Sequence, residues 1–123
     1  MIRIRVTERE GGFTVSAFGH AGYAPHGQDI VCAGVSALLY GLVSFLKGSL
    51  SIATAGGSCG AGECSPLRVG EGDGMLAVEI ISPRPLYREA LDLTVAGISL
   101  IAACYPAYVT LENNRKGDEY EPN

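Results

Sequence analysis

The sequence has no tryptophan, only two histidines and little charge, since 18% of its 123 residues are Asp, Glu, Lys or Arg. Nine basic residues against thirteen acidic ones give a net charge of −4. Nucleic-acid-binding domains usually carry a basic patch, so this balance argues against direct contact with nucleic acid. A basic peptide segment is a more compatible ligand.

An export signal is also missing, because Met1–Val6 alternates like a strand and no apolar stretch follows it. We therefore expect a cytoplasmic protein whose four cysteines are reduced thiols. A run of seventeen residues, Ile30–Leu46, contains no charge. It is short for a membrane span and has no basic flank on its N-terminal side, so we interpret it as a core helix and expect no membrane partner. Five apolar residues form its predicted stripe: Val31, Val35, Leu38, Leu42 and Phe45.

The remaining periodicities predict strands joined by glycine-containing turns and a second helix that Pro106 ends. The predicted order is strand, strand, helix, strand, strand, helix, strand, and short hairpins favour antiparallel pairing. We expect an α+β fold with a mainly antiparallel sheet packed against two long helices. The predicted elements are Ile2–Thr7, Phe13–Phe18, Ile30–Leu46, Leu67–Val69, Met75–Ile81, Tyr87–Cys104 and Tyr108–Glu112.

Two segments lack a clear period. Residues 47–62 are rich in glycine, serine and alanine and are interpreted as a loop, with at most a short extended piece near Ser51–Thr54. Residues 113–123 are predicted to be a disordered polar tail after a single domain of residues 1–112. Pro66 predicts that the strand after it lies at a sheet edge, and Cys104 is interpreted as a small core residue.

The candidate site lies between Gly19 and Cys32, where His20 precedes Cys32 by twelve positions. Asp29 is a good N-cap, so Cys32 falls in the first turn of a helix, where backbone N–H groups stabilise negative charge and favour a thiolate. A loop containing Gly22 and Gly27 can bring His20 over the helix entrance as a general base.

Two further residues have alternative interpretations. Asp29 either only caps the helix or also orients the His20 imidazole. Ser36, one turn after Cys32, either lines the site or bonds back to the helix backbone. Gly22, Gly27, Asp29 and Ser36 are our candidates for contact with a bound peptide, and the Gly22–Gln28 loop is a candidate gate. His26 is interpreted as an exposed loop histidine.

The segments Gly19-His20-Ala21, Asp29-Ile30-Val31-Cys32-Ala33 and Val35-Ser36 resemble the signature of the bacterial ribosomal-processing cysteine proteases. The resemblance covers residues 1 to about 112 and implies His20 as general base and Cys32 as nucleophile. It also implies a cytoplasmic homodimer without a cofactor. Its implied substrate is the N-terminal extension of protein twenty-seven of the large ribosomal subunit, cut between Phe and Ala during ribosome maturation. Some relatives are carried by phages, so a capsid-processing protease is the alternative within the family.

Other classes of function remain open. His20, His26 and Cys32, with Cys59 and Cys64, are possible zinc ligands, although their spacing lacks the paired Cys-x2-Cys pattern of structural zinc sites and we expect no metal. Cys59 and Cys64 also allow a thiol redox protein. A non-catalytic peptide-binding domain is the third alternative.

Overall fold

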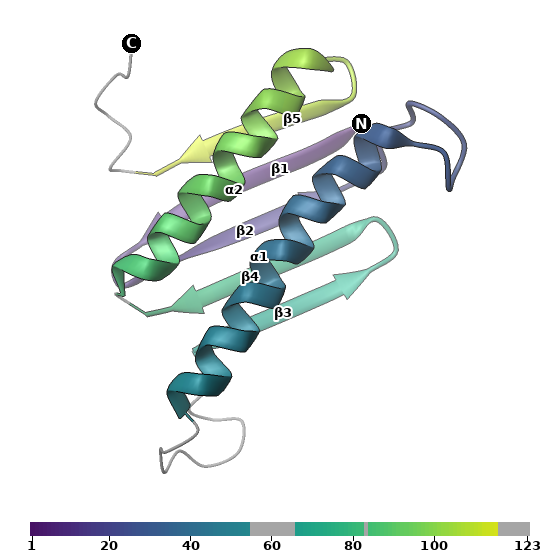
Figure 1. Ribbon diagram of the computed structural model, residues 1–123. Helices are drawn as coiled ribbons and strands as arrows, with labels where there is room; N and C mark the ends of the chain where they lie inside the picture. Colours follow the sequence, from purple (N-terminus) through teal and green to yellow (C-terminus); the bar gives the residue numbers. More distant parts are fainter. Residues whose placement is uncertain (55–65, 83, 116–123) are drawn as a thin grey trace.

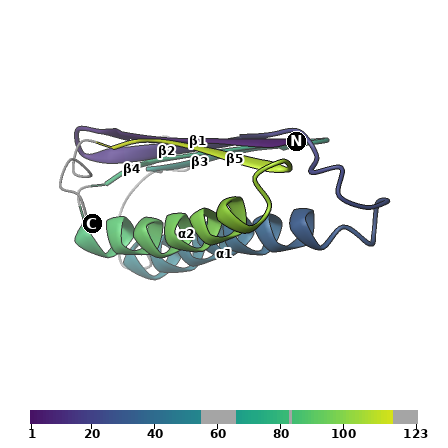
Figure 2. The same cartoon turned by 90° about the horizontal axis from the view of Figure 1, so that it is seen from above.

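Two helices cover one face of a five-stranded sheet in the computed structural model of this protein (Figure 1, Figure 2). The structure describes residues 1–54, 66–82 and 84–115. The elements are β1 (Ile2–Arg9), β2 (Gly12–Phe18), α1 (Ile30–Thr54), β3 (Leu67–Gly72), β4 (Met75–Ile81), α2 (Pro85–Cys104) and β5 (Val109–Asn114). The predicted α+β class and element order are confirmed.

The sheet has the strand order β3-β4-β2-β1-β5. Both hairpins are antiparallel, as is the pairing of β2 with β4, whereas β1 and β5 run parallel. This parallel pair arises because α2 returns the chain to the end of the sheet where β1 starts, so that Val109 pairs with Ile2. The strand after Pro66, β3, lies at an edge as predicted.

The core lies between the sheet and the helices. Alternate residues of the strands face it, and α1 contributes Val31, Val35, Leu39, Leu42, Val43 and Leu46. The predicted stripe is wrong at Phe45, which is 42% exposed. Its members follow a 3.5-residue spacing, which drifts around an α-helix, so the buried face moves to Leu39, Val43 and Leu46.

The first helix is also longer than predicted. It continues through residues 47–54, where a loop with an extended piece was expected. Tertiary contacts explain this, because Leu50 packs against the core and the Ser49 hydroxyl lies 3.1 Å from the Tyr87 hydroxyl of α2. Residues 55–65, including Cys59 and Cys64, lie outside the described residues.

Other boundaries differ as well. Cys104 is exposed at the end of α2, so its prediction as a core residue is wrong. The strand β5 includes Asn113 and Asn114, which the prediction placed in the polar tail, and residues 116–123 lie outside the described residues.

The first helix is long and apolar enough to cross a membrane by length and composition alone, over Ile30–Leu50. Core helices pass the same test, and the inner face of α1 packs on the sheet. The arrangement is that of the predicted core helix.

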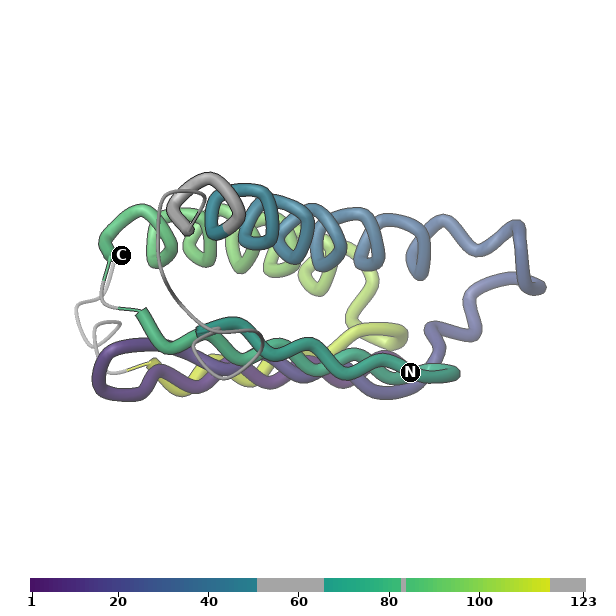
Figure 3. The backbone as a smooth tube through the Cα atoms, turned by 90° about the horizontal axis from the view of Figure 1, so that it is seen from below, coloured from purple at the N-terminus to yellow at the C-terminus, as the bar shows by residue number. Residues whose placement is uncertain are grey.

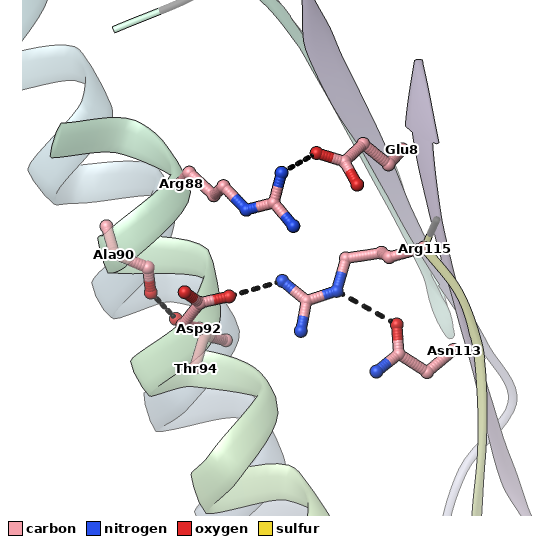
Figure 4. A network of polar contacts seen from close by, with 7 residues as sticks. All are labelled: Glu8, Arg88, Ala90, Asp92, Thr94, Asn113 and Arg115. Carbon is pink, nitrogen blue, oxygen red and sulfur yellow. Dashed lines mark hydrogen bonds and ion pairs between the residues drawn. The ribbon is translucent and has the colours of Figure 1, made fainter. Parts of the chain in front are cut away.

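Ionic contacts hold α2 against the sheet at the end where β1 and β5 finish (Figure 4). Arg88 pairs with Glu8 of β1, and Asp92 pairs with Arg115 after β5. The Arg115 Nε also donates to Asn113 Oδ1 at 3.1 Å. The loop that carries His20 and the start of α1 with Cys32 lie at the opposite end of the sheet.

Candidate active site

Three connections meet at one end of the sheet: residues 19–29, the β3–β4 turn and residues 105–108 after α2. The first of these projects beyond the helix layer and the sheet (Figure 3). It contains most of the residues that the sequence predicted for the site.

His20 follows β2 after a single glycine. Gly19 has a φ of +96°, and a Cβ there would lie 2.3 Å from the Met1 carbonyl oxygen, so only glycine fits. The Gly19 N–H donates to the Gly74 carbonyl at 2.8 Å. These contacts fix the backbone from which the His20 side chain leaves the sheet.

Cys32 is the third residue of α1 and is half-buried. Its N–H donates to Asp29 Oδ1 at 2.9 Å, which makes Asp29 the predicted N-cap. The other Asp29 oxygen accepts the N–H groups of Tyr23 and Ala24 at 3.0 and 3.4 Å. Asp29 thus connects the loop to the helix, and the Cys32 N–H can bind a substrate oxyanion only if Asp29 releases it.

The second interpretation of Asp29 finds no support in the described part of the chain, where the carboxylate paired with His20 belongs to Asp73. Asp73 Oδ1 lies 3.6 Å from His20 Nε2. Asp73 lies in one of the glycine-containing turns predicted from the sequence and was not among the predicted site residues. The signal in the sequence was an acidic residue in a two-residue Asp-Gly turn. Which loop lies beside that turn depends on the pairing of β2 with β4.

Asp29 should make stability depend on pH. The Cys32 N–H bond is the main reason that the pKa of the Asp29 carboxyl is lowered, and partial burial opposes it. Because the pKa of this carboxyl is lower in the folded protein, its ionised form stabilises the fold at pH values above the pKa of the unfolded chain. That stability is lost as the pH falls through the pKa of the folded protein. We expect Asp29→Ala to lower the melting temperature by a few degrees at pH 7. The difference should shrink as the pH falls below the ordinary carboxyl pKa of 3.8, so it should be smaller at pH 3 than at pH 7.

Thermal unfolding followed by circular dichroism at both pH values measures this difference. Glu10→Ala, which removes a carboxylate from the exposed β1–β2 turn, is the control. An Asp29→Ala deficit of equal size at both pH values would contradict the capping account.

Two cavities contain the predicted site residues. The larger, of about 570 Å³, is lined by His20, Cys32, Gly22, Gly27 and Asp29, with His26 and Asp73 beside them. The smaller, of about 140 Å³, lies between α1 and the β3–β4 hairpin. His20, Cys32 and Ser36 line it together with Leu39, Tyr40, Met75 and Leu76. The structure thus brings all six predicted site residues to adjoining cavities.

The candidate gate is also attached by an aromatic contact. The Tyr23 ring packs edge-on against Tyr105 and Tyr108, with centroid distances of 5.5 and 5.2 Å. Sequence reasoning missed this contact, because Tyr23 is far along the chain from Tyr105 and Tyr108. The loop is therefore anchored to the connection between α2 and β5.

The sequence model of the family described as cysteine protease Prp matches residues 1–110. The chain belongs to the cysteine protease Prp family. A ribosomal processing cysteine protease Prp from Mycoplasma pneumoniae is 26% identical over 120 residues, which cover 96% of this chain and 100% of that protein. The Bacillus subtilis protein of the same name is 46% identical over 41 residues, or 33% of this chain and 37% of its own length.

Solved structures show the same fold. The Staphylococcus aureus Prp, described as an essential ribosomal processing protease with a covalently linked product peptide, gives a TM-score of 0.69 at 24% identity. That alignment covers 93% of this chain and 100% of the Prp chain. A Streptococcus mutans protein gives 0.64 at 27% identity and covers 94% and 96%. These likenesses support the α+β fold of a Prp protein.

The metal-binding and thiol redox hypotheses each require a particular set of side chains. Within residues 1–54, 66–82 and 84–115, no three His, Cys, Asp or Glu side chains gather as a metal site. Cys59 and Cys64, which the redox hypothesis requires, lie outside these ranges. The geometry of the described residues suits nucleophilic catalysis, with a thiol at a helix start and an imidazole facing the same cavity.

Proposed function

We propose that this protein is a cysteine endopeptidase in which Cys32 is the nucleophile and His20 the general base. The observation that carries the proposal is that these two side chains, from separate elements, line both cavities. His20 would take the thiol proton, and the thiolate would attack the scissile carbonyl. His20 would then protonate the departing amine and activate the water that hydrolyses the thioester.

The proposed substrate is the N-terminal extension of protein twenty-seven of the large ribosomal subunit, cut between Phe and Ala. The names of the relatives support it, since they are ribosomal processing proteases. The smaller cavity also has an apolar lining from Leu39, Tyr40 and Met75, which suits apolar side chains near the cut. A net charge of −4 is compatible with a basic peptide.

Incubation with the uncut N-terminal peptide, followed by mass spectrometry, tests this function. We expect a single cut between Phe and Ala. A peptide with Asp in place of the Phe before the cut should react about 100-fold more slowly, because a charged group would enter an apolar pocket. An intact ribosomal peptide would contradict the substrate and turn attention to the phage capsid alternative.

We also propose that the protein is a homodimer. A groove of about 420 Å³ lies between α1 and α2 and is lined by Phe45, Leu86 and Leu93 among others. Leu86, Leu93 and Leu100 repeat every seven residues on α2 and are 39%, 74% and 69% exposed. A second copy placed there would bury this apolar surface. The cytoplasmic location stays a prediction from the sequence.

Native mass spectrometry tests the dimer. The parent protein should appear as two chains, and Leu93→Glu should shift it to single chains, because a charge would be buried in the contact. Thr110→Glu adds the same charge to the face of the sheet opposite α1 and α2, and it should leave the mass unchanged. A monomeric parent protein would contradict the proposal.

A further inference from the structure

The β3–β4 turn places a carboxylate beside the imidazole of the candidate dyad. Asp73 and Gly74 form the two-residue connection between Gly72 and Met75, which pair across the hairpin. Asp73 Oδ1 lies 3.6 Å from His20 Nε2, and Asp73 also lines the larger cavity. No other described carboxylate forms an ion pair with His20.

The imidazole and this turn are held together by more than charge. The Gly19 N–H donates to the Gly74 carbonyl, so the residue before His20 is bonded to the turn itself. A Cβ on Gly74 would lie 2.8 Å from His20 Nε2, which shows that the ring rests against the backbone there. Gly74 also has a φ of +66°, where glycine is favoured.

We propose that Asp73 is a positioning residue for His20, an inference that rests on the proposed function. An ionised carboxylate only accepts hydrogen bonds, so a bond to Asp73 requires the proton of neutral His20 to sit on Nε2. Nδ1 is then the unprotonated nitrogen that takes the Cys32 proton.

The expected effect is moderate. The side chains of His20 and Asp73 are 62% and 99% exposed, and exposed ion pairs contribute little to stability. In free enzymes, catalytic hydrogen bonds are often long and shorten when substrate binds. We expect Asp73→Ala to lower kcat by about tenfold with little change in KM, because the residue acts on the dyad and not on peptide binding.

Three variants distinguish positioning from simple loss of charge. Asp73→Ala removes the acceptor, and Asp73→Asn keeps a carbonyl oxygen at the same position and should restore at least about half of kcat. Glu10→Ala is the matched control, since Glu10 occupies the two-residue turn of the other hairpin at the far end of the sheet. It should leave kcat unchanged.

A second measurement does not depend on cleavage. The ring ¹H–¹⁵N signals of His20 in the free full-length protein should shift in Asp73→Ala and stay in place in Glu10→Ala. Unchanged ring signals, or an Asp73→Ala protein with the kcat of the parent, would overturn the role of Asp73. A parent protein that does not cleave the peptide would overturn the proposed function. The ring signals would still test the contact between His20 and Asp73.

Discussion

Replacing Cys32 by alanine is expected to lower cleavage of the Phe-Phe-Ala peptide by about 10³-fold or more, because the reaction loses its nucleophile. The fold should survive. Cys32 is half-buried beside the core, and the bond that caps the helix uses its backbone N–H, which alanine keeps. His20→Ala should give a loss of similar size, since removing either member of such a pair disables the other.

Initial rates with the uncut peptide measure these losses, and circular dichroism checks that the variants are folded. Cys104→Ala is the matched control, because it removes an exposed thiol at the C-terminal end of α2 that lines neither cavity, and it should retain full activity. Cleavage at the parent rate by folded Cys32→Ala would refute the proposed mechanism. Alkylation with iodoacetamide at neutral pH should modify Cys32 before Cys104 and should depend on His20.

The second large effect is expected for Gly19→Ala. The new Cβ would meet the Met1 carbonyl at 2.3 Å, and the φ of +96° disfavours any other residue. We expect a loss of about 2–4 kcal/mol in the free energy of unfolding, as for other strained backbone substitutions. Activity should fall further than stability explains, because the clash lies one residue before His20.

Gly48→Ala is the appropriate comparison. Gly48 lies within α1, and a Cβ there would meet nothing within 4 Å, so the same change should stabilise the helix by about 0.5–1 kcal/mol. Urea unfolding of both variants measures the contrast. A Gly19→Ala protein as stable and active as the parent would show that the backbone at Gly19 can relax without cost.

The features that the sequence predicted depend on local signals. Alternation predicts the strands, Asp29 marks the start of α1, and the block from Gly19 to Cys32 brings together both members of the candidate dyad. These patterns lie within about a dozen residues of one another, so they need no knowledge of the tertiary fold.

The missed features depend on contacts between distant segments. The parallel pairing of β5, the position of Asp73 beside His20 and the exposure of Phe45 all follow from how the elements pack. The same holds for the continuation of α1 past Leu46, where tertiary contacts outweigh the low helix propensity of glycine and serine.

The attachment of Tyr23 has a practical optical consequence. The chain has no tryptophan, so tyrosine is its main fluorophore, and the Tyr23 ring packs edge-on against Tyr105 and Tyr108 beside the site. Any movement of the loop that separates Tyr23 from its two neighbours changes the surroundings of three of the six tyrosines at once. Tyrosine emission therefore offers a label-free signal of loop position, which stopped-flow mixing with peptide can follow in real time.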